Sequence, residues 1–176
     1  MPVALNLTDL MDYTEWERQK WHSWLKQHGD DALKVSAGPH GDGRFSAVGD
    51  IIKHIFSAES RYIDRLSDCP LTDPASIPSD NTASLFQFGA QSRSALRKFI
   101  ETLPSQEWDA FREFDFFGGI LRATPKKIVI HILLHEIRHW AQIATLLRLN
   151  GLKDDLRDFI FTPVLGGELR RGQGKT

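Results

Sequence analysis

Four long stretches of the chain carry apolar side chains at the spacing of an α-helix. The stretch around residue 50 is typical, because Ile51, Ile52, Ile55 and Ile63 return to one helix face. This pattern predicts an all-α protein, and four helices of such length are enough for a four-helix bundle. The predicted helices span residues 8–28, 46–66, 81–103 and 125–150.

Residues that cap or end helices stand at the boundaries of these stretches. Gly29 follows the first stretch, and Ser46 is expected to cap the start of the second one. Thr124 and Pro125 open the fourth stretch, as a capping side chain followed by a proline at the first helical position. Gly151 follows that stretch and can adopt the left-handed conformation that closes a helix. The boundaries therefore support the same four helices.

The segments between the predicted helices carry glycine and proline. Residues 29–44 are rich in glycine and residues 69–80 contain three prolines, so both are predicted to be irregular loops. Alternating apolar residues around Gly118-Gly119, within residues 111–121, predict a small β-hairpin between the third and fourth helices. From Lys153 onward we expect an extended segment that wraps along the bundle.

Length and composition are those of an ordinary globular protein. The 176 residues fit one domain, expected over residues 1–176 with a flexible tail from about residue 165. The net charge of −1 leaves no basic surplus for a phosphate backbone, so no nucleic-acid partner is expected. We find no secretory signal and no apolar run long enough for a membrane span, so no membrane partner is expected. The one cysteine, Cys69, suits a reducing compartment, and we expect a cytoplasmic location.

The most informative stretch lies in the fourth predicted helix, where His131, His135 and His139 follow one another at four-residue steps. Each step turns a helix by roughly 40° and rises about 6 Å, so the imidazoles share one face, which should point into the bundle. Buried neutral imidazoles need hydrogen-bond partners, and charging several of them together is costly. A divalent metal ion resolves both problems, because neutral imidazole is a common metal ligand.

A third ligand must come from another helix, and four histidines remain: His22, His28, His40 and His54. His22 is on the polar side of the first predicted helix, His28 is at its end, and His40 is in the glycine-rich loop. His54 stands among isoleucines in the middle of the second predicted helix and is the best candidate. It lies at the edge of the apolar arc, so periodicity alone leaves the choice open.

Two other metal patterns overlap the histidine series. His135, Glu136 and His139 match the H-E-x-x-H pattern of zinc metalloproteases, in which the glutamate polarises the attacking water. An extended form of that pattern needs glycine at Gln142 and histidine at Thr145, so it fails. Glu136 and His139 also match the E-x-x-H element of di-iron bundles, but no second element is present. The metalloprotease stays an alternative that we do not favour.

The chain resembles the DinB-like family, also called the DinB/YfiT family, over residues 8–151. The resemblance rests on the order of several motifs. They are Tyr13 and Trp16 in the first predicted helix, residues 46–54 and Glu59 in the second, Thr124-Pro125 before the fourth, and then His131, His135, His139 and Gln142. Histidines at this spacing followed by glutamine are the family's usual pattern, whereas Trp140 and Ala141 replace a frequent arginine and glycine.

This resemblance implies a four-helix bundle with a non-simple connection order and a metal site built from the second and fourth helices. By position the ligands are His54, His135 and His139, with His131 beside them in the pocket. Family metals include nickel, zinc and iron, and dimers are common, so we expect one such divalent ion and a homodimer. Some relatives transfer low-molecular-weight thiols or isomerise thiol adducts, so the resemblance implies a small-molecule substrate, such as a low-molecular-weight thiol.

The histidines thus predict a metal-binding protein, and we favour a metal-dependent enzyme, either a thiol S-transferase or a hydrolase. Four side chains are candidates to orient a ligand or act as a base, although no spacing assigns a catalytic role: His131, Gln142, Glu59 and Glu136. A pocket lined by Tyr13, Tyr62 or Trp140, beside an ion with free coordination positions, would favour the enzyme. A closed, fully protein-ligated ion would favour a non-catalytic metal-binding or stress-associated protein.

Overall fold

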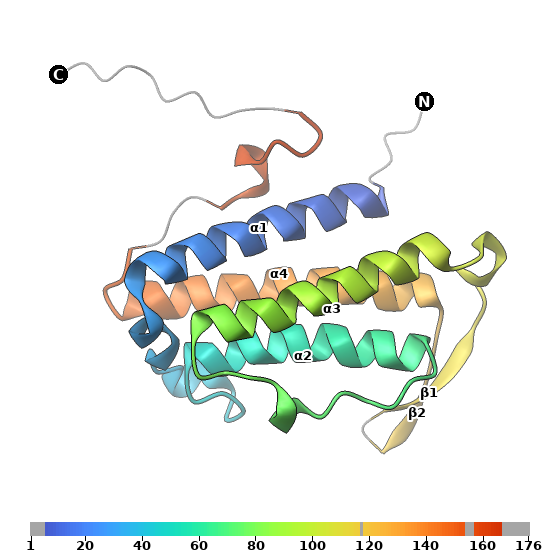
Figure 1. Cartoon of the computed structure of the whole chain (residues 1–176), viewed down its shortest axis with the longest axis horizontal. Helices are drawn as coiled ribbons and strands as arrows, with labels where there is room; N and C mark the ends of the chain where they lie inside the picture. Colours follow the sequence, from blue (N-terminus) through green and yellow to red (C-terminus); the bar gives the residue numbers. More distant parts are fainter. Residues whose placement is uncertain (1–5, 117, 154–156, 167–176) are drawn as a thin grey trace.

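Four long helices form the body of the protein, as the apolar pattern predicts (Figure 1). The computed structural model describes residues 6–116, 118–153 and 157–166. The helices are α1 (Leu7–His28), α2 (Val48–Leu66), α3 (Thr82–Thr102) and α4 (Pro125–Leu149). The fold class is therefore an all-α four-helix bundle, and every predicted helix is present.

The helices do not simply alternate in direction along the chain (Figure 1). α2 and α3 run parallel: Phe56 packs on Phe86, and Glu59 further along α2 contacts Ser92 further along α3. The segment 67–81 makes this arrangement possible, because it returns along the length of the bundle before α3 begins. α4 then runs antiparallel to α2 and lies beside it. The connection order is thus the non-simple one that the resemblance implies.

The starts of α2 and α4 use different capping groups. Thr124 caps α4 as predicted, since its hydroxyl accepts a hydrogen bond from the Lys127 N–H at 3.1 Å. The prediction of Ser46 as the cap of α2 is wrong, because the N-cap is Ala47, whose side chain cannot accept a hydrogen bond. The Asp50 carboxylate compensates by accepting from the Ser46 and Ala47 N–H groups at 2.9 and 3.0 Å.

The predicted hairpin is present between α3 and α4. Strand β1 (Arg112–Phe116) pairs antiparallel with strand β2 (Gly119–Ala123). Gly118 between them has a φ of 78°, a conformation that glycine adopts without strain. Phe114 of β1 is buried among apolar side chains of the bundle, which gives the short hairpin the support it needs.

The segment after α4 returns over α1 (Figure 1). It contains a short 3-10 helix, η5 (Phe159–Phe161), whereas the sequence predicts extended chain alone. Phe159 packs edge-on against Tyr13 of α1, with the ring centroids 5.2 Å apart. Of the predicted flexible tail from about residue 165, all but the first two residues lie outside the described residues.

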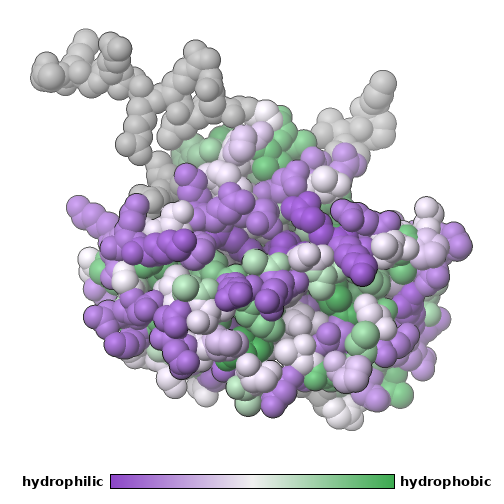
Figure 2. Space-filling view, viewed as in Figure 1, coloured by the Kyte–Doolittle hydropathy of each residue, from purple (hydrophilic) through white to green (hydrophobic). Residues whose placement is uncertain are grey.

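Apolar side chains fill the inside of the bundle, and polar ones cover most of the face seen in Figure 2. Trp21 of α1 stacks on Trp140 of α4 with ring centroids 5.4 Å apart. Phe56 of α2 reaches Gly89 of α3 so closely that a Cβ there would lie 2.8 Å from its ring. Within the described residues, no helix is long and apolar enough to cross a membrane.

Candidate metal centre

Three histidines from two helices meet between α2 and α4. His54 comes from α2, and His135 and His139 come from successive turns of α4. The Nε2 atom of His135 lies 3.1 Å from that of His54 and 3.2 Å from that of His139. One nitrogen of each ring lies within 4.8 Å of the other two. The structure thus brings together the three residues that the resemblance selects.

This spacing suits one metal ion bound by all three nitrogens. A tetrahedral ion that binds imidazole at about 2.0–2.1 Å places its ligand nitrogens about 3.3 Å apart. The Nε2 separations of 3.1 and 3.2 Å are close to that value. A neutral imidazole ring has one N–H and one lone pair. When three rings turn the same nitrogen toward one point, a cation there can accept all three lone pairs, whereas the rings cannot all hydrogen-bond to each other.

The tautomer of His139 is set by a chain of hydrogen bonds that leads away from the cluster. The Gln142 Nε2 donates to the His40 carbonyl at 2.6 Å, which leaves the Gln142 Oε1 to accept from the His139 Nδ1 at 2.8 Å. The neutral His139 ring therefore carries its proton on Nδ1 and presents the Nε2 lone pair to the cluster. Hydrogen bonds of this kind orient histidine ligands and raise their basicity. Gln142 thus lies where it can orient the His139 ring.

All three histidines are neutral at physiological pH. Burial, reinforced by the nearby His139, lowers the pKa of His54 to about 4 and that of His135 to about 3. Burial also lowers the pKa of His139, although the hydrogen bond to Gln142 acts in the opposite direction. Neutral imidazole is the form that binds a metal, so a cation can bind here without displacing protons.

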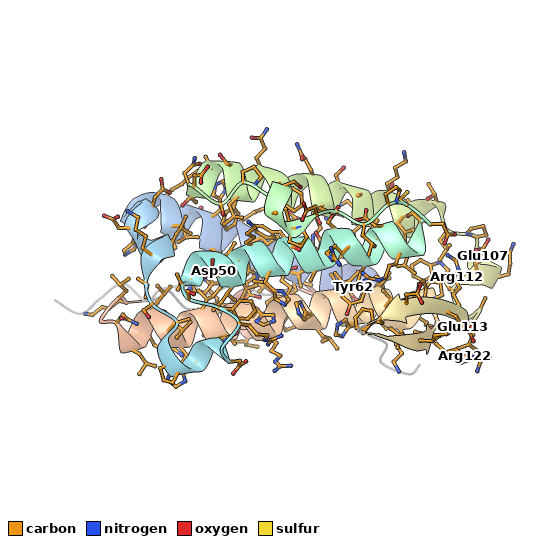
Figure 3. All side chains as sticks on the ribbon, turned by 90° about the horizontal axis from the view of Figure 1, so that it is seen from below. Asp50, Tyr62, Glu107, Arg112, Glu113 and Arg122 are labelled. Atoms are coloured by element: carbon orange, nitrogen blue, oxygen red, sulfur yellow. The ribbon has the colours of Figure 1, made fainter. Side chains whose placement is uncertain are left out.

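The triad opens onto a cavity of about 960 Å³ between α2 and α4. Phe45 covers one side of the cluster, with its ring centroid 5.0 Å from that of His54 and 5.9 Å from that of His139. From there the cavity follows the face of α2 that carries Tyr62 toward the hairpin, whereas Asp50 lies at the other end, near the start of α2 (Figure 3). A cavity of this size suits a small-molecule ligand.

His131 lies outside the triad but lines the same cavity, as predicted for a pocket residue. Its Nε2 lies 3.2 Å from the Tyr62 hydroxyl, and its ring centroid lies 5.6 Å from that of His135. Burial raises the pKa of Tyr62 and lowers that of His131, so both groups are neutral at physiological pH. They form a hydrogen-bonded pair on the cavity wall, next to the triad.

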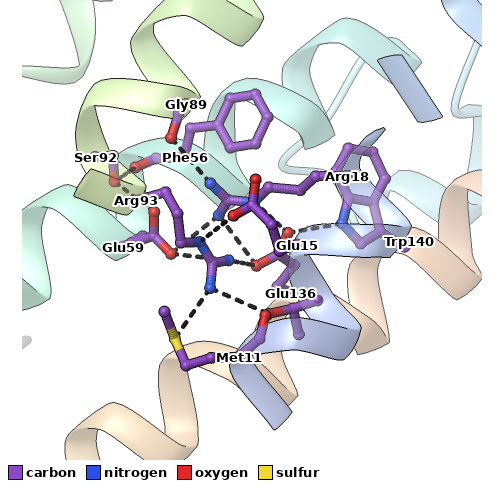
Figure 4. A network of polar contacts seen from close by, with 11 residues as sticks. Met11, Glu15, Arg18, Phe56, Glu59, Gly89, Ser92, Arg93, Glu136 and Trp140 are labelled. Atoms are coloured by element: carbon purple, nitrogen blue, oxygen red, sulfur yellow. Dashed lines mark hydrogen bonds and ion pairs between the residues drawn. The ribbon is translucent and has the colours of Figure 1, made fainter. Parts of the chain in front are cut away.

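Glu59 and Glu136, predicted to orient a ligand or act as a base, lie elsewhere. Their carboxylates point toward α1 and α3, into a buried ion network with Arg18 and Arg93 (Figure 4). Burial alone would raise the pKa of Glu136, but the charges of Arg18 and Arg93 outweigh it and hold that pKa below its usual value. Glu136 also accepts a hydrogen bond from the Trp140 indole at 3.0 Å. Both glutamates are therefore occupied inside the bundle.

This position of Glu136 removes the base from the metalloprotease interpretation. In the H-E-x-x-H pattern the glutamate must reach a water on the metal. Here both oxygens of Glu136 accept hydrogen bonds from buried donors, and the side chain does not line the cavity. The matching letters in residues 135–139 thus do not produce the arrangement that the chemistry requires.

Two of the three aromatic residues whose presence in the pocket would favour an enzyme lie away from the cavity. Tyr13 packs against Phe159 on the outer side of α1, because α1 does not border the cavity. Trp140 is fully buried against Trp21, since its position on α4 faces the bundle core. Of these three, Tyr62 is the one that lines the cavity.

Several lining residues have no counterpart in the sequence predictions. Arg61 and Arg65 follow His54 by two and three helical turns on the same face of α2, so the helical period could have identified them once His54 was selected. Phe45 comes from the loop before α2, and Phe116 comes from β1. No periodicity relates these two rings to the histidines, and only the tertiary structure reveals them.

Comparison with protein families agrees with this geometry. The model of the DinB family matches residues 1–165. No match is found among the curated proteins. The matched region contains all four helices, the hairpin and the three clustered histidines. Since the match covers most of the sequence and the bundle carries the histidine cluster, the chain belongs to the DinB family.

Proposed function

We propose that the protein is a metal-dependent enzyme that holds one divalent ion with His54, His135 and His139 and acts on a small molecule in the adjoining cavity. The observation that carries this proposal is the convergence of three imidazole nitrogens at the wall of a cavity of about 960 Å³. Three protein ligands leave coordination positions free for water or substrate, as catalytic sites do. Nickel, zinc and iron are the candidate ions, because imidazole suits all of them.

The surroundings of the triad favour an enzyme over a non-catalytic metal-binding protein. Within the described residues, no cysteine or carboxylate joins the three histidines. Asp50 lines the cavity, but its carboxylate holds the start of α2 through two backbone hydrogen bonds. An ion at the triad therefore keeps a side open to the cavity, whereas structural metal sites are closed by protein ligands.

A divalent ion at this site supplies Lewis-acid chemistry that lowers the pKa of a water or a thiol. The chain's own residues provide the rest. Gln142 holds His139 in its ligand tautomer, and Phe45 shields one side of the cluster from water. Tyr62 and His131 can receive a proton and pass it on, because each can both donate and accept a hydrogen bond.

Transfer of a low-molecular-weight thiol suits this site better than hydrolysis. The ordinary pKa of a thiol is about 8.5 and that of water is about 15.7, so a thiol needs less activation by the ion and no carboxylate base. Among the described residues, the only carboxylate that lines the cavity is that of Asp50, whose Oδ2 caps the start of α2. In the transfer, the sulfur bonds to an electrophilic carbon, the leaving group departs with the bonding electron pair, and the thiol proton passes to the cavity wall or to water.

Elemental analysis of the untagged protein, purified without added metal, tests the metal site. We expect about one equivalent of nickel, zinc or iron per chain in the wild type and none in His135→Ala. His28→Ala is the matched control, because His28 is exposed at the end of α1 and should leave the metal in place. No metal in the wild type, and no uptake when these ions are added, would refute the site.

Activity of the metal-loaded protein separates the enzyme from the non-catalytic alternative. We expect thiol consumption with a chromogenic electrophile, lost in His135→Ala and retained in His28→Ala. Cleavage of ester substrates instead would identify a hydrolase, and turnover of neither class would favour the non-catalytic protein. The homodimer expected from the resemblance stays a prediction, which the mass of the protein in solution tests.

A further inference from the structure

The cavity beside the triad is lined mainly by positive charge. Apart from the histidines, its charged side chains are the one carboxylate of Asp50 and five basic groups, those of Arg44, Lys53, Arg61, Arg65 and Arg138. Asp50 offsets one of these five charges, and Asp42, 3.5 Å from Arg44, offsets another, so the lining keeps a positive excess. A concave surface lined by charges of one sign concentrates ligands of the opposite sign. The cavity therefore favours an anion.

Arg61 and Arg65 form a pair of cations on α2, toward the hairpin end of the cavity. Arg61 donates to the Thr72 carbonyl at 2.8 Å, and Arg65 donates to the Arg61 carbonyl at 3.1 Å. Within the described residues, neither guanidinium has a carboxylate oxygen within 4.0 Å. Burial lowers the pKa of Arg65, and the neighbouring charge of Arg61 adds to this effect. Asp64 acts on Arg65 in the opposite direction but forms no ion pair with it, so a bound anion would supply the direct counter-charge.

Two aromatic rings frame this pair of arginines. Tyr62 and Phe116 stack with ring centroids 5.8 Å apart and ring planes 26° apart. The Arg65 guanidinium lies over the Phe116 ring, 5.2 Å from its centroid. This contact holds the Arg65 side chain against the wall, so less conformational entropy is lost when it binds a ligand. The wall thus presents guanidinium donors beside a flat apolar surface.

Helix geometry gives the spacing along α2 between His54 and the arginine pair. Arg61 follows His54 by seven residues and Arg65 follows it by eleven, which places them about 10 and 16 Å further along the axis of α2. We propose that the substrate carries an oxyanion, either a carboxylate or a phosphate; this proposal rests on the proposed function of the triad. Arg61 and Arg65 bind the oxyanion while the reacting group of the same molecule lies at the triad. Guanidinium groups bind both oxyanions through paired N–H donors.

Anion binding to the metal-free chain tests the arginine pair independently of the metal. Calorimetry compares phenyl phosphate and benzoate with neutral benzyl alcohol, on the wild type and on the Arg61→Gln/Arg65→Gln double variant. We expect the double variant to bind the preferred anion at least about tenfold more weakly, because charge-assisted hydrogen bonds are lost. Arg122→Gln is the matched control, since Arg122 lies on the hairpin over Phe111 and does not line the cavity (Figure 3).

The outcomes separate this inference from the proposed function. Equal affinity of the wild type and the double variant for both anions would overturn the anion site, whether or not the triad binds metal. Anion binding that depends on Arg61 and Arg65, in a protein whose triad takes up no metal, would refute the metal enzyme and keep the anion site. The single variants Arg61→Gln and Arg65→Gln, each expected to weaken binding by a smaller factor, decide the question if the double variant does not fold.

A second measurement tests whether one molecule spans both sites. Cobalt-loaded protein is titrated with ω-mercaptooctanoate and with ω-mercaptooctanol, and the thiolate-to-cobalt absorption band reports binding. Both thiols are long enough to reach Arg61 from the triad, but only the first carries a carboxylate. We expect the carboxylate to bind at least about tenfold more tightly in the wild type and to lose that advantage in the double variant. Equal affinity of the two thiols in the wild type would overturn the proposal.

Discussion

His135 and Glu136 are neighbours on α4, yet they belong to two unlike polar regions of the bundle. His135 is part of a half-buried cluster of neutral imidazoles at a cavity wall. Glu136 is part of a buried network with Glu59, Arg18 and Arg93, in which every carboxylate oxygen has a hydrogen-bond partner (Figure 4). One region turns the nitrogens of neutral rings toward a common point at a cavity wall, whereas the other pairs its charges within the protein.

The difference shows how a structural polar cluster can be distinguished from a ligand site. In the buried network two positive and two negative side chains balance, so loss of one leaves an unpaired charge inside the bundle. In the histidine cluster the rings are neutral, and loss of one leaves no buried charge. The network should therefore contribute to folding stability, and the cluster should contribute to ligand binding.

Substitutions at the two neighbouring positions give the largest expected effect. Glu136→Ala leaves Arg18 and Arg93 buried without their shared carboxylate, so we expect the free energy of unfolding to fall by about 3–5 kcal/mol. His135→Ala removes a half-buried neutral ring, and we expect the metal-free protein to lose about 1 kcal/mol or less. Chemical denaturation of the metal-free proteins measures both changes.

Metal binding should show the reverse order for the same two variants. We expect His135→Ala to lose the metal and the folded fraction of Glu136→Ala to keep it. Asp109→Ala is the control for removal of a charge, because its ion pair with Lys126 is exposed and should be worth about 1 kcal/mol or less. Similar losses of metal-free stability in His135→Ala and Glu136→Ala would contradict the distinction between the two regions.

Gln142→Ala sharpens the comparison from the side of the histidine cluster. The substitution removes the acceptor that holds His139 in its ligand tautomer, so we expect metal affinity to fall by about 10–100-fold. The stability of the metal-free protein should hardly change. Competition with a chelator of known affinity measures the loss.

Two further variants control for this effect. Gln142→Glu keeps an oxygen acceptor for the His139 Nδ1–H and should retain most of the metal affinity. Thr145→Ala lies one turn further along α4 at an exposed position and should change nothing. Wild-type affinity in Gln142→Ala would mean that the hydrogen bond orients the ring without affecting metal binding.

The helices and the ligands on α4 could be predicted because both follow local periodicity. Thr124 and Pro125 mark the start of α4, and a four-residue step places His135 and His139 on one face. The start of α2 shows a limit of this reasoning. Ser46 has a suitable side chain, but the backbone turns into the helix one residue later, and Asp50 does the capping from within the helix.

The partners of the buried charges could not be predicted, because they depend on contacts between helices that are distant in sequence. Periodicity leaves His54 at the edge of an apolar arc, and only the family resemblance selected it. Glu59 and Glu136 are polar residues close to the histidines in sequence, which made them candidates for the site. Their true partners, Arg18 and Arg93, come from α1 and α3, and no local signal indicates which carboxylate an arginine reaches.

Glu17 lies at the edge of the buried network and should give the smallest of the expected effects. Burial raises the pKa of Glu17 to about 8, and the nearby charge of Glu136 adds to this effect. Because this value exceeds the ordinary 4.5, the folded protein holds a proton that the unfolded chain releases between the two values. The contribution of this proton to folding stability is complete below about pH 4.5, and it is lost as the pH rises through about 8.

Glu17→Gln fixes this side chain in an uncharged form and tests the effect. We expect the variant and the wild type to have the same melting temperature at acidic pH. At alkaline pH the variant should melt about 2–4 °C higher, which corresponds to about 1 kcal/mol in the free energy of unfolding. Thermal melts across the pH range measure this, with Asp12→Asn, an exposed carboxylate on α1, as the control. Parallel curves for the wild type and Glu17→Gln would mean that Glu17 is ionised in the fold. The buried region would then hold a third negative charge, stabilised by the nearby Arg157.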